Sequence, residues 1–321
     1  PNNRGFDLFY GMKAGGRDYF YNEKKSDRPG DERNLLLNDR QVKFEKYLTD
    51  AFSEKAVEFI NESSQPFMMY LAYNAVHTPM QATDEDMAKF EGHPRQKLAA
   101  MTYALDRGVG TVIRGLKDSG KFDNTLIFFL SDNGGATTNQ SSNYPLKGFK
   151  GNKFEGGHRV PYFVVWKNGI PAGKPYDGLV SSLDIFATAI DAASISKTRN
   201  RLDGVSLLPY LKGKKGEPHK VLYWRKMDTR AIRSGDYKLI ITHGVDSVLY
   251  NIRRDPEEMN NLINKEPDLY RKLAKKFAKW EKNECIEPSW LEEGWRKITN
   301  RYHQQLMHNE IKTAQDLYKK K

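Results

Sequence analysis

Apolar residues recur at every third or fourth position in two stretches of the first half of the chain. The first stretch spans residues 52–60 and the second spans residues 98–116. This spacing predicts two amphipathic helices. Each helix is followed by a continuous apolar run of strand length, at residues 67–72 and 125–130. Strands that are apolar on both faces are typical of sheets covered by helices on each side, so the pattern predicts an α/β fold with a mainly parallel sheet.

Beyond residue 200 the pattern changes. Residues 197–219 are rich in Pro, Gly and basic side chains, which is typical of a linker. Short strand-like runs separated by turn signals then follow, at residues 221–224, 229–233, 237–241 and 248–250. They predict a small α+β C-terminal subdomain with an antiparallel sheet. The expected division is therefore a partial α/β domain over residues 1–200, this subdomain with a helix over residues 219–283, and a basic helical tail over residues 284–321.

Composition narrows the class of protein. The chain has 321 residues, 38% of them hydrophobic, which favours a packed globular protein over a disordered one. The longest apolar run, at residues 67–73, has seven residues, far below the roughly 20 of a membrane helix, so we expect no membrane span. Cys285 is the single cysteine, which excludes an internal disulfide.

The net charge of +11 is concentrated near the C-terminus. From residue 271 onward there are 13 basic and 7 acidic residues, a balance of +6. The same stretch has helical spacing of apolar residues, so its lysines are expected to form a solvated face. No recognition motif accompanies them, and we expect no nucleic-acid partner.

Asp132 and Asn133 directly follow the apolar run at residues 125–130. Asp-Asn-Gly is often only a turn, but a hairpin needs a second strand at once, and residues 136–142 are small and polar. The alternative is that Asp132 and Asn133 provide two oxygen ligands for a hard cation at the carboxyl end of a strand, where α/β sheets bind ligands.

Two further features could belong to the same site. Lys147, Lys150, Lys153 and Arg159 lie among glycines in residues 147–161, either as a solvated basic loop or as a site for a sulfate- or phosphate-sized anion. His77 follows the apolar run at residues 67–72, on the edge of the sheet expected for Asp132, and is either structural or functional.

Taken in order, these motifs resemble the formylglycine-dependent sulfatases of the arylsulfatase type, within the alkaline phosphatase superfamily. The resemblance rests on the Ser-Asp-Asn-Gly motif at residues 131–134, the Glu-Gly-Gly-x-Arg-Val-Pro block at 155–161 and the Asp-Pro-Glu-Glu motif at 255–258. It covers about residues 1–283. It implies an alkaline-phosphatase-like fold and the hydrolysis of an aryl or carbohydrate sulfate ester to an alcohol and inorganic sulfate.

The resemblance also implies roles for individual residues. Asp132 and Asn133 would be two ligands of a calcium ion, Lys150 would hold the sulfate oxygens, and His77 would lie beside the leaving-group oxygen. Lys150 is preferred to Lys147 because it stands five residues before Glu155, where the family has its active-site lysine. Arg230, Arg233 and His243 of the small subdomain either line the pocket or belong to the surface.

The family's nucleophile is a formylglycine made from a Cys/Ser-x-Pro-x-Arg motif, and this sequence contains no such pentapeptide. We therefore expect the chain to be the C-terminal part of a sulfatase, inactive alone. The complete protein would need a formylglycine-generating enzyme, would act on a sulfated small molecule or glycan, and would be periplasmic or secreted as the family is.

Two other functions remain open from the sequence. A phosphodiesterase or phosphonate monoester hydrolase of the same superfamily could share the Asp-Asn pair and the cationic loop. A degenerate, non-catalytic sulfatase could hold sulfated glycans through Lys150, Arg159 and the basic tail.

Overall fold

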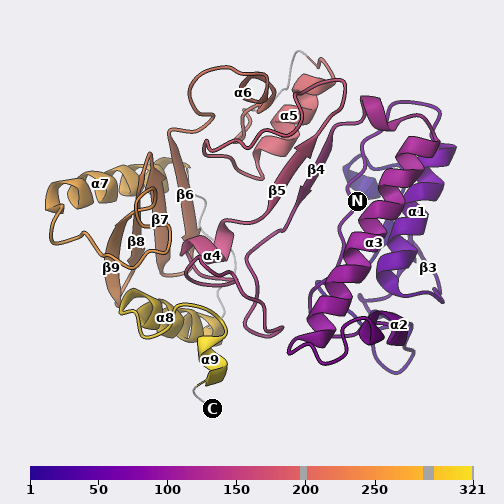
Figure 1. Cartoon of the computed structure of the whole chain (residues 1–321), viewed down its shortest axis with the longest axis horizontal. Coiled ribbons are helices and arrows are strands. Elements are labelled where there is room, and N and C mark those ends of the chain that lie inside the picture. Colours follow the sequence, from indigo (N-terminus) through magenta and orange to yellow (C-terminus); the bar gives the residue numbers. More distant parts are fainter. Residues whose placement is uncertain (196–200, 285–292, 320–321) are drawn as a thin grey trace. The chain divides into compact units, whose positions relative to one another are not determined.

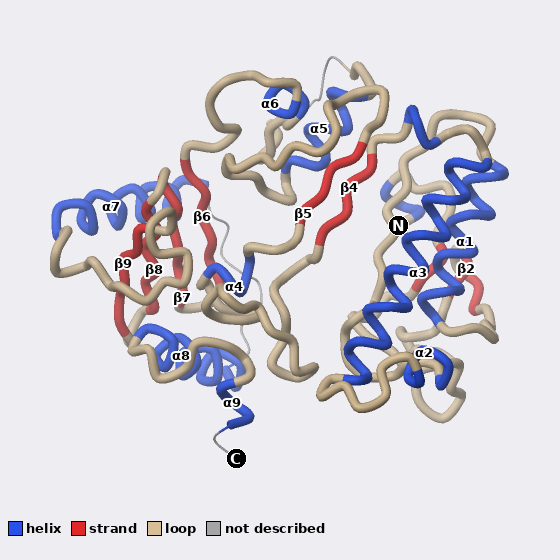
Figure 2. The backbone as a smooth tube through the Cα atoms, viewed as in Figure 1, coloured by secondary structure: helices blue, strands red, loops and turns tan. Residues whose placement is uncertain are grey.

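The computed structural model describes residues 1–195, 201–284 and 293–319. These residues divide into two compact units, Pro1–Asn124 and Thr125–Lys321, and each is described by itself. Figure 1 names the helices and strands, and Figure 2 shows how much of both units is loop. Cys285 and residues 197–200 of the expected linker lie outside the described residues. The predicted three-part division of the chain stays a prediction.

The first unit is built on two packed helices. Its elements are η1 (Asn2–Arg4), β1 (Tyr10–Gly11), β2 (Leu36–Leu37), β3 (Arg40–Gln41), α1 (Leu48–Glu62), α2 (Asp84–Ala88), α3 (Gln96–Asp118) and η2 (Phe122–Asn124). Helices α1 and α3 lie side by side and confirm the two predicted apolar stripes. Gly108 and Gly115 of α3 allow this close packing, because a Cβ there would come within 2.6 Å of Ser53 Oγ and 2.9 Å of Val57 Cγ2.

The predicted strand at residues 67–72 pairs with no strand in the described part of the chain. Its side chains alternate between partly buried and exposed positions, and Met68 and Tyr70 are 61% and 79% exposed. The alternation is that of a strand with one covered face, whereas the prediction assumed burial on both faces.

The second unit contains two separate sheets. Its elements are β4 (Ile127–Leu130), α4 (Glu155–His158), β5 (Tyr162–Val165), α5 (Asp184–Ala192), α6 (Leu208–Leu211), β6 (Val221–Lys226), β7 (Thr229–Ser234), β8 (Tyr237–Thr242), β9 (Asp246–Asn251), α7 (Pro267–Glu284), α8 (Glu293–Met307) and α9 (Asp316–Lys319). Strands β4 and β5 pair antiparallel, with Ile127 opposite Val165. All strand pairs among the described residues are antiparallel, so the expected parallel pairing is not found there. An apolar run predicts a buried strand but does not specify its direction.

The four strands β6 to β9 form the predicted antiparallel meander, in sequence order. Alternate residues point to opposite faces, as strand geometry requires. On one face Ile232, Leu239 and Leu249 pack with Leu273 and Phe277 of α7. On the other face Ile240, Val248 and Tyr250 pack with Leu306 and Met307 of α8. Phe149 and Phe154, from the glycine-containing segment at residues 147–161, pack on the same face. The sheet therefore carries this loop on its second face.

Candidate active site

Asp132 and Asn133 lie at the carboxyl end of β4, in a turn with a defined hydrogen-bond pattern. The Ser131 hydroxyl donates to the Asn133 carbonyl at 2.8 Å, and the Asn133 amide donates to Asp132 Oδ1. The next strand, β5, begins only at Tyr162, so no hairpin follows this Asp-Asn-Gly turn. The Asp132 side chain is exposed, and no ion pair neutralises it among the described residues.

The loop after β4 and the Lys150 loop, defined here as residues 147–157, are fastened together. Gly134 N–H donates to the Gly157 carbonyl at 3.1 Å, and Lys150 N–H donates to the Gly135 carbonyl at 3.0 Å. A Cβ on Gly134 would lie 1.8 Å from the Gly156 carbonyl oxygen, so only glycine permits this contact. Asp132, Asn133 and Lys150 are thereby brought to two adjoining loops.

The Asn143 side chain makes a second connection between the two loops. Its Oδ1 accepts a hydrogen bond from Gly135 N–H at 2.8 Å, and its Nδ2 donates to the Gly148 carbonyl at 3.0 Å. Both backbone groups would otherwise lose partners in a part-buried position, which proteins rarely allow. Asn143 was not among the residues predicted from sequence.

The two lysines compared in the sequence analysis differ in their surroundings. Lys147 is fully buried, and its ammonium donates to the Glu258 carbonyl at 3.1 Å and to Asn309 Oδ1 at 2.5 Å. Burial lowers the pKa of Lys147 to about 8. Lys150, in contrast, is exposed. Of the two lysines, Lys150 is therefore the exposed one, and its role at the sulfate stays a prediction.

Glu155 begins the Glu-Gly-Gly block and forms part of a buried ionic network. Lys238 Nζ of β8 lies 2.8 Å from Glu155 Oε1 and 2.9 Å from Glu258 Oε1. Burial alone would raise the pKa of Glu155, but Lys238 and His158 hold that pKa well below its ordinary value. Burial and the neighbouring Glu155 raise the pKa of Glu258 to about 7, although Lys238 opposes this. The carboxyl group of Glu155 is thus a structural anchor.

Of the three subsidiary residues named from the sequence, Arg233 belongs to this network, since its Nη1 lies 3.5 Å from Glu155 Oε2. Arg230 instead pairs with Glu281 at 2.8 Å. The backbone N–H of His243 donates to the Asp228 carbonyl at 3.0 Å.

The C-terminal tail is also hydrogen-bonded to the Lys150 loop. Lys153 N–H donates to His303 Nε2 at 3.2 Å, and Gly148 N–H donates to the Lys312 carbonyl at 2.7 Å. His303 Nδ1 lies 2.8 Å from the Thr299 carbonyl, which requires a proton on Nδ1 and leaves Nε2 as an acceptor. Burial lowers the pKa of His303 to about 4. The tail is therefore more than a solvated basic face, and periodicity alone did not indicate this contact.

His77 belongs to the first unit, so its predicted convergence with Asp132 and Lys150 stays a prediction. Its side chain is exposed and its Nδ1 lies 2.8 Å from the Thr78 carbonyl. The Tyr19 hydroxyl lies 2.9 Å from the His77 carbonyl oxygen and 2.7 Å from that of Asn74. Both distances are within hydrogen-bonding range, which fixes the backbone on either side of the imidazole.

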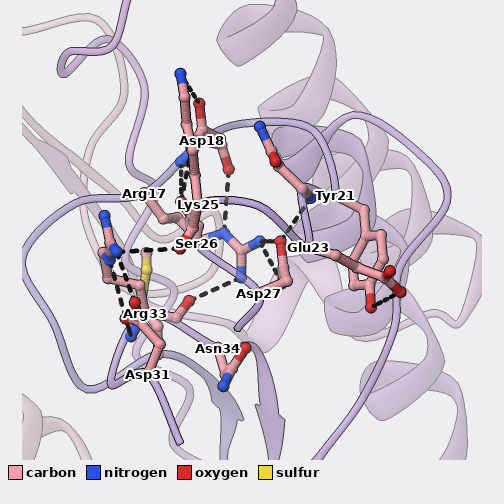
Figure 3. Close-up of polar contacts among 12 residues, drawn as sticks. Arg17, Asp18, Tyr21, Glu23, Lys25, Ser26, Asp27, Asp31, Arg33 and Asn34 are labelled. Carbon is pink, nitrogen blue, oxygen red and sulfur yellow. Dashed lines mark hydrogen bonds and ion pairs between the residues drawn. The ribbon is translucent and has the colours of Figure 1, made fainter. Parts of the chain in front are cut away.

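The irregular segment that carries Tyr19 is held by a buried polar network, and Figure 3 shows its Arg17–Asp27 and Asp18–Ser26 contacts. Arg17 donates to both carboxylate oxygens of Asp27, at 2.8 and 2.7 Å, and both side chains are fully buried. Asp18 accepts from Ser26 and from Gln81, whose own Oε1 accepts from Tyr19 N–H at 2.8 Å. Although burial would raise the pKa of Asp18, the hydrogen bonds from Ser26 and Gln81 lower it. The network thus connects this segment to the loop of His77.

Calcium is the metal implied by the sequence, and the donor set at Asp132 and Asn133 fits it. Calcium takes six to eight oxygen ligands, and a carboxylate with a neighbouring amide carbonyl supplies two of that type. No group of three or more His, Cys, Asp or Glu side chains that could hold a metal occurs in the described ranges. The two residues would therefore be part of a larger ligand set.

As for membranes, none of the helices in the described part of the chain is both long and apolar enough to span one.

Comparisons with known proteins match sulfatases over most of the chain. A family model described as Sulfatase matches residues 1–195, and a model described as N-sulphoglucosamine sulphohydrolase, C-terminal, matches residues 150–283. The uncharacterized sulfatase YdeN of Escherichia coli (strain K12) is 38% identical over 234 residues, which cover 70% of this chain and 40% of YdeN. N-acetylgalactosamine-6-sulfatase of Canis lupus familiaris is 32% identical over 202 residues, 60% of this chain and 38% of that protein.

A solved structure of Ps i-CgsB in complex with k-i-k-neocarrahexaose superposes with a TM-score of 0.83. It is 36% identical and covers 94% of this chain and 72% of its own. This likeness confirms the predicted fold class. The chain spans about two fifths of the length of the two curated relatives named above. On the matches of its motifs, its family models and its fold, the chain belongs to the sulfatase family.

Proposed function

We propose that the complete protein encoded by this gene hydrolyses a sulfate ester to an alcohol and inorganic sulfate. The observation that carries the proposal is the fastening of the Asp132 loop to the Lys150 loop through Gly134–Gly157 and Lys150–Gly135 hydrogen bonds. One loop carries the Asp132 carboxylate and the Asn133 amide, which are hydrogen-bonded to each other, and the adjoining loop carries the exposed side chain of Lys150. Membership of the sulfatase family supports the same reaction.

Lys150 is proposed to hold the oxygens of the sulfuryl group. During sulfuryl transfer, as in phosphoryl transfer, negative charge spreads over the equatorial oxygens and onto the leaving oxygen. A cation fixed in advance stabilises that charge without reorganising at the moment of reaction. Lys150 suits this role because its backbone is hydrogen-bonded to Gly135 while its side chain is exposed.

Asp132 and Asn133 are proposed to hold calcium together with ligands beyond those described. A bound calcium ion would supply electrostatic stabilisation of the sulfate oxygens. The residues themselves keep their oxygens oriented through the Ser131–Asn133 and Asn133–Asp132 hydrogen bonds.

His77 is proposed to deliver a proton to the leaving alcohol oxygen. The contact of its Nδ1 with the Thr78 carbonyl requires a proton on that nitrogen. A second proton, on Nε2 of this exposed side chain, can then be donated as the bond between sulfur and the leaving oxygen breaks. The family's nucleophile is a formylglycine, and the motif from which it is made is absent from this sequence, so the attacking step is not assigned to any residue here.

The proposed substrate is a sulfated carbohydrate. Ps i-CgsB, which is 36% identical, was solved with an oligosaccharide, k-i-k-neocarrahexaose, and N-acetylgalactosamine-6-sulfatase carries a sugar sulfate in its name. The cationic Lys150 loop supports an anionic ester as the substrate.

The test is turnover by the complete protein, produced with a formylglycine-generating enzyme and assayed on an aryl sulfate and on sulfated sugars. Lys150→Ala and His77→Ala should each lower kcat/KM by about tenfold or more. Lys265→Ala removes the charge of an exposed lysine elsewhere and is the matched control. Unchanged rates in the first two variants would refute the assigned roles, and hydrolysis of phosphate diesters in preference to sulfate esters would refute the reaction.

A further inference from the structure

Three lysine side chains gather on and beside the Lys150 loop without a carboxylate partner among the described residues. Lys150 and Lys153 belong to the loop, and Lys226 is the last residue of β6. Lys226 Nζ lies 3.4 Å from the position that a Cβ on Gly151 would take, so its ammonium lies directly against the loop. We refer to Lys150, Lys153 and Lys226 as the lysine cluster.

Two carboxylates close to the cluster in sequence, those of Glu155 and Asp228, are paired with other cations. Glu155 is paired with Lys238 at 2.8 Å and with Arg233 at 3.5 Å. Asp228 follows Lys226 by two residues, yet its Oδ2 accepts from Asn300 at 2.8 Å and lies 3.6 Å from Arg296. Among the residues that the structure describes, no carboxylate therefore pairs with the positive charge of the cluster, although Glu155 and Asp228 are close to it in sequence.

This charge is also partly removed from water, which distinguishes it from an ordinary surface. Burial, followed by repulsion from Lys226 and Lys238, lowers the pKa of Lys153 to about 8. Burial and then Lys150 lower the pKa of Lys226. Like charges held together in a half-buried position destabilise the free protein. A bound anion would offset both the loss of hydration of the ammonium groups and their mutual repulsion.

We propose that Lys153 and Lys226 bind a second anionic group of the substrate, beside the sulfate ester that Lys150 holds. The substrate class is then a glycan that carries at least two negative groups on the same or neighbouring sugars. This inference rests on the proposed function for the role of Lys150, but the binding of an anion at Lys153 and Lys226 does not require turnover.

The first test measures binding without catalysis. Lysines of the complete protein are acylated, and the rate at each site is followed by peptide mass spectrometry in sodium sulfate and in sodium chloride of equal ionic strength. Sulfate should slow labelling of Lys226 by roughly threefold or more, since a bound anion shields its ammonium. Exposed Lys265 should label equally in both salts.

Two variants locate the anion in the same experiment. Lys153→Met should abolish the protection of Lys226, and Lys150→Met should leave that protection in place. Equal labelling of Lys226 in the two salts would overturn the proposal. Loss of protection in Lys150→Met would also overturn it, because the anion would then bind only at the sulfate ester site.

The second test concerns specificity. The ratio of kcat/KM for a disulfated sugar to that for its monosulfated counterpart should fall about tenfold in Lys226→Met and stay the same in Lys265→Met. An unchanged ratio in Lys226→Met would contradict the proposal. If the protein hydrolyses neither sugar, the proposed function fails, and the labelling experiment still decides whether the lysine cluster binds an anion.

Discussion

The ammonium group of Lys238 lies 2.8 Å from the carboxylate of Glu155, and both side chains are buried. Lys238 lies on β8, the third strand of the C-terminal meander. Glu155 is the first residue of the Glu-Gly-Gly block, which follows Lys150 in the sequence. The ion pair therefore connects the sheet to the loop of the candidate active site. Glu258 lies in the turn after the meander, and its Oε2 accepts a hydrogen bond from Glu155 N–H at 2.6 Å. This bond is a second connection between the two segments.

We expect Lys238→Met to destabilise the protein strongly. The substitution leaves two buried carboxylates without their shared cation, and breaking a buried pair in this way costs about 3–5 kcal/mol. The measurement is the free energy of unfolding by denaturant. Lys265→Met, at an exposed lysine, should change it by less than about 0.5 kcal/mol. A value for Lys238→Met as small as that of the control would mean that the pair contributes little.

His303 should make stability depend on pH in a defined window. Burial lowers the pKa of His303 in the folded protein to about 4, whereas an unfolded histidine titrates near 6.5. Between these values the unfolded chain binds more protons, so the contribution of neutral His303 to stability is lost as the pH falls from about 6.5 towards 4. We expect His303→Gln, which cannot be protonated, to lose less stability than the wild type over this window.

The measurement is the difference in unfolding free energy between His303→Gln and the wild type at a series of pH values, which cancels the other titrating groups. His308→Gln is the control, because His308 is exposed on the same tail. A difference that stays constant with pH would contradict the assigned protonation state.

Gly134→Ala should disturb the contact between the two loops. Its Cβ would lie 1.8 Å from the Gly156 carbonyl, so one backbone must move. Displacing catalytic groups by about an ångström can lower turnover by roughly a hundredfold. Amide exchange of residues 147–157, measured by mass spectrometry, should rise together with the loss of turnover. Gly294→Ala in α8, where a Cβ meets no atom within 4 Å, is the control and should slightly stabilise its helix.

Asp132→Ala should weaken calcium binding to the complete protein. Removing one carboxylate ligand is expected to lower the affinity by about tenfold or more, since calcium affinity depends on the number of charged ligands. Calorimetric titration with calcium gives this value directly. Asp203→Ala, at an exposed aspartate, keeps the change in net charge the same and should leave the affinity unaltered.

Helices and the C-terminal meander were predictable from sequence because each has a periodic pattern that its packing preserves. The stripe at residues 98–116 became α3, and the runs between residues 221 and 250 became β6 to β9. The direction of strand pairing was not predictable. The run at residues 125–130 is apolar and mostly half-buried, and such a run suits an antiparallel partner such as β5 as well as a parallel one.

Within the site, the resemblance to the sulfatases singled out Asp132, Asn133 and Lys150, and these residues lie on adjoining loops in the structure. The supporting residues carry no such signal. Lys238 lies in a strand where a charged side chain is normally exposed, and nothing in its neighbours indicates that Glu155, 83 positions earlier, buries it. His303 likewise acquires its role only through a contact 150 residues away in the chain.

One face of the C-terminal sheet is shared by Phe149 and Phe154 of the Lys150 loop and by Leu306 and Met307 of α8. A chimera that grafts the loop of another sulfatase onto this protein would therefore meet a surface shaped for its original occupant. Recombination between relatives should give a folded protein only when the loop, the meander and the tail are exchanged together. These three segments, although distant in sequence, should therefore change together in evolution.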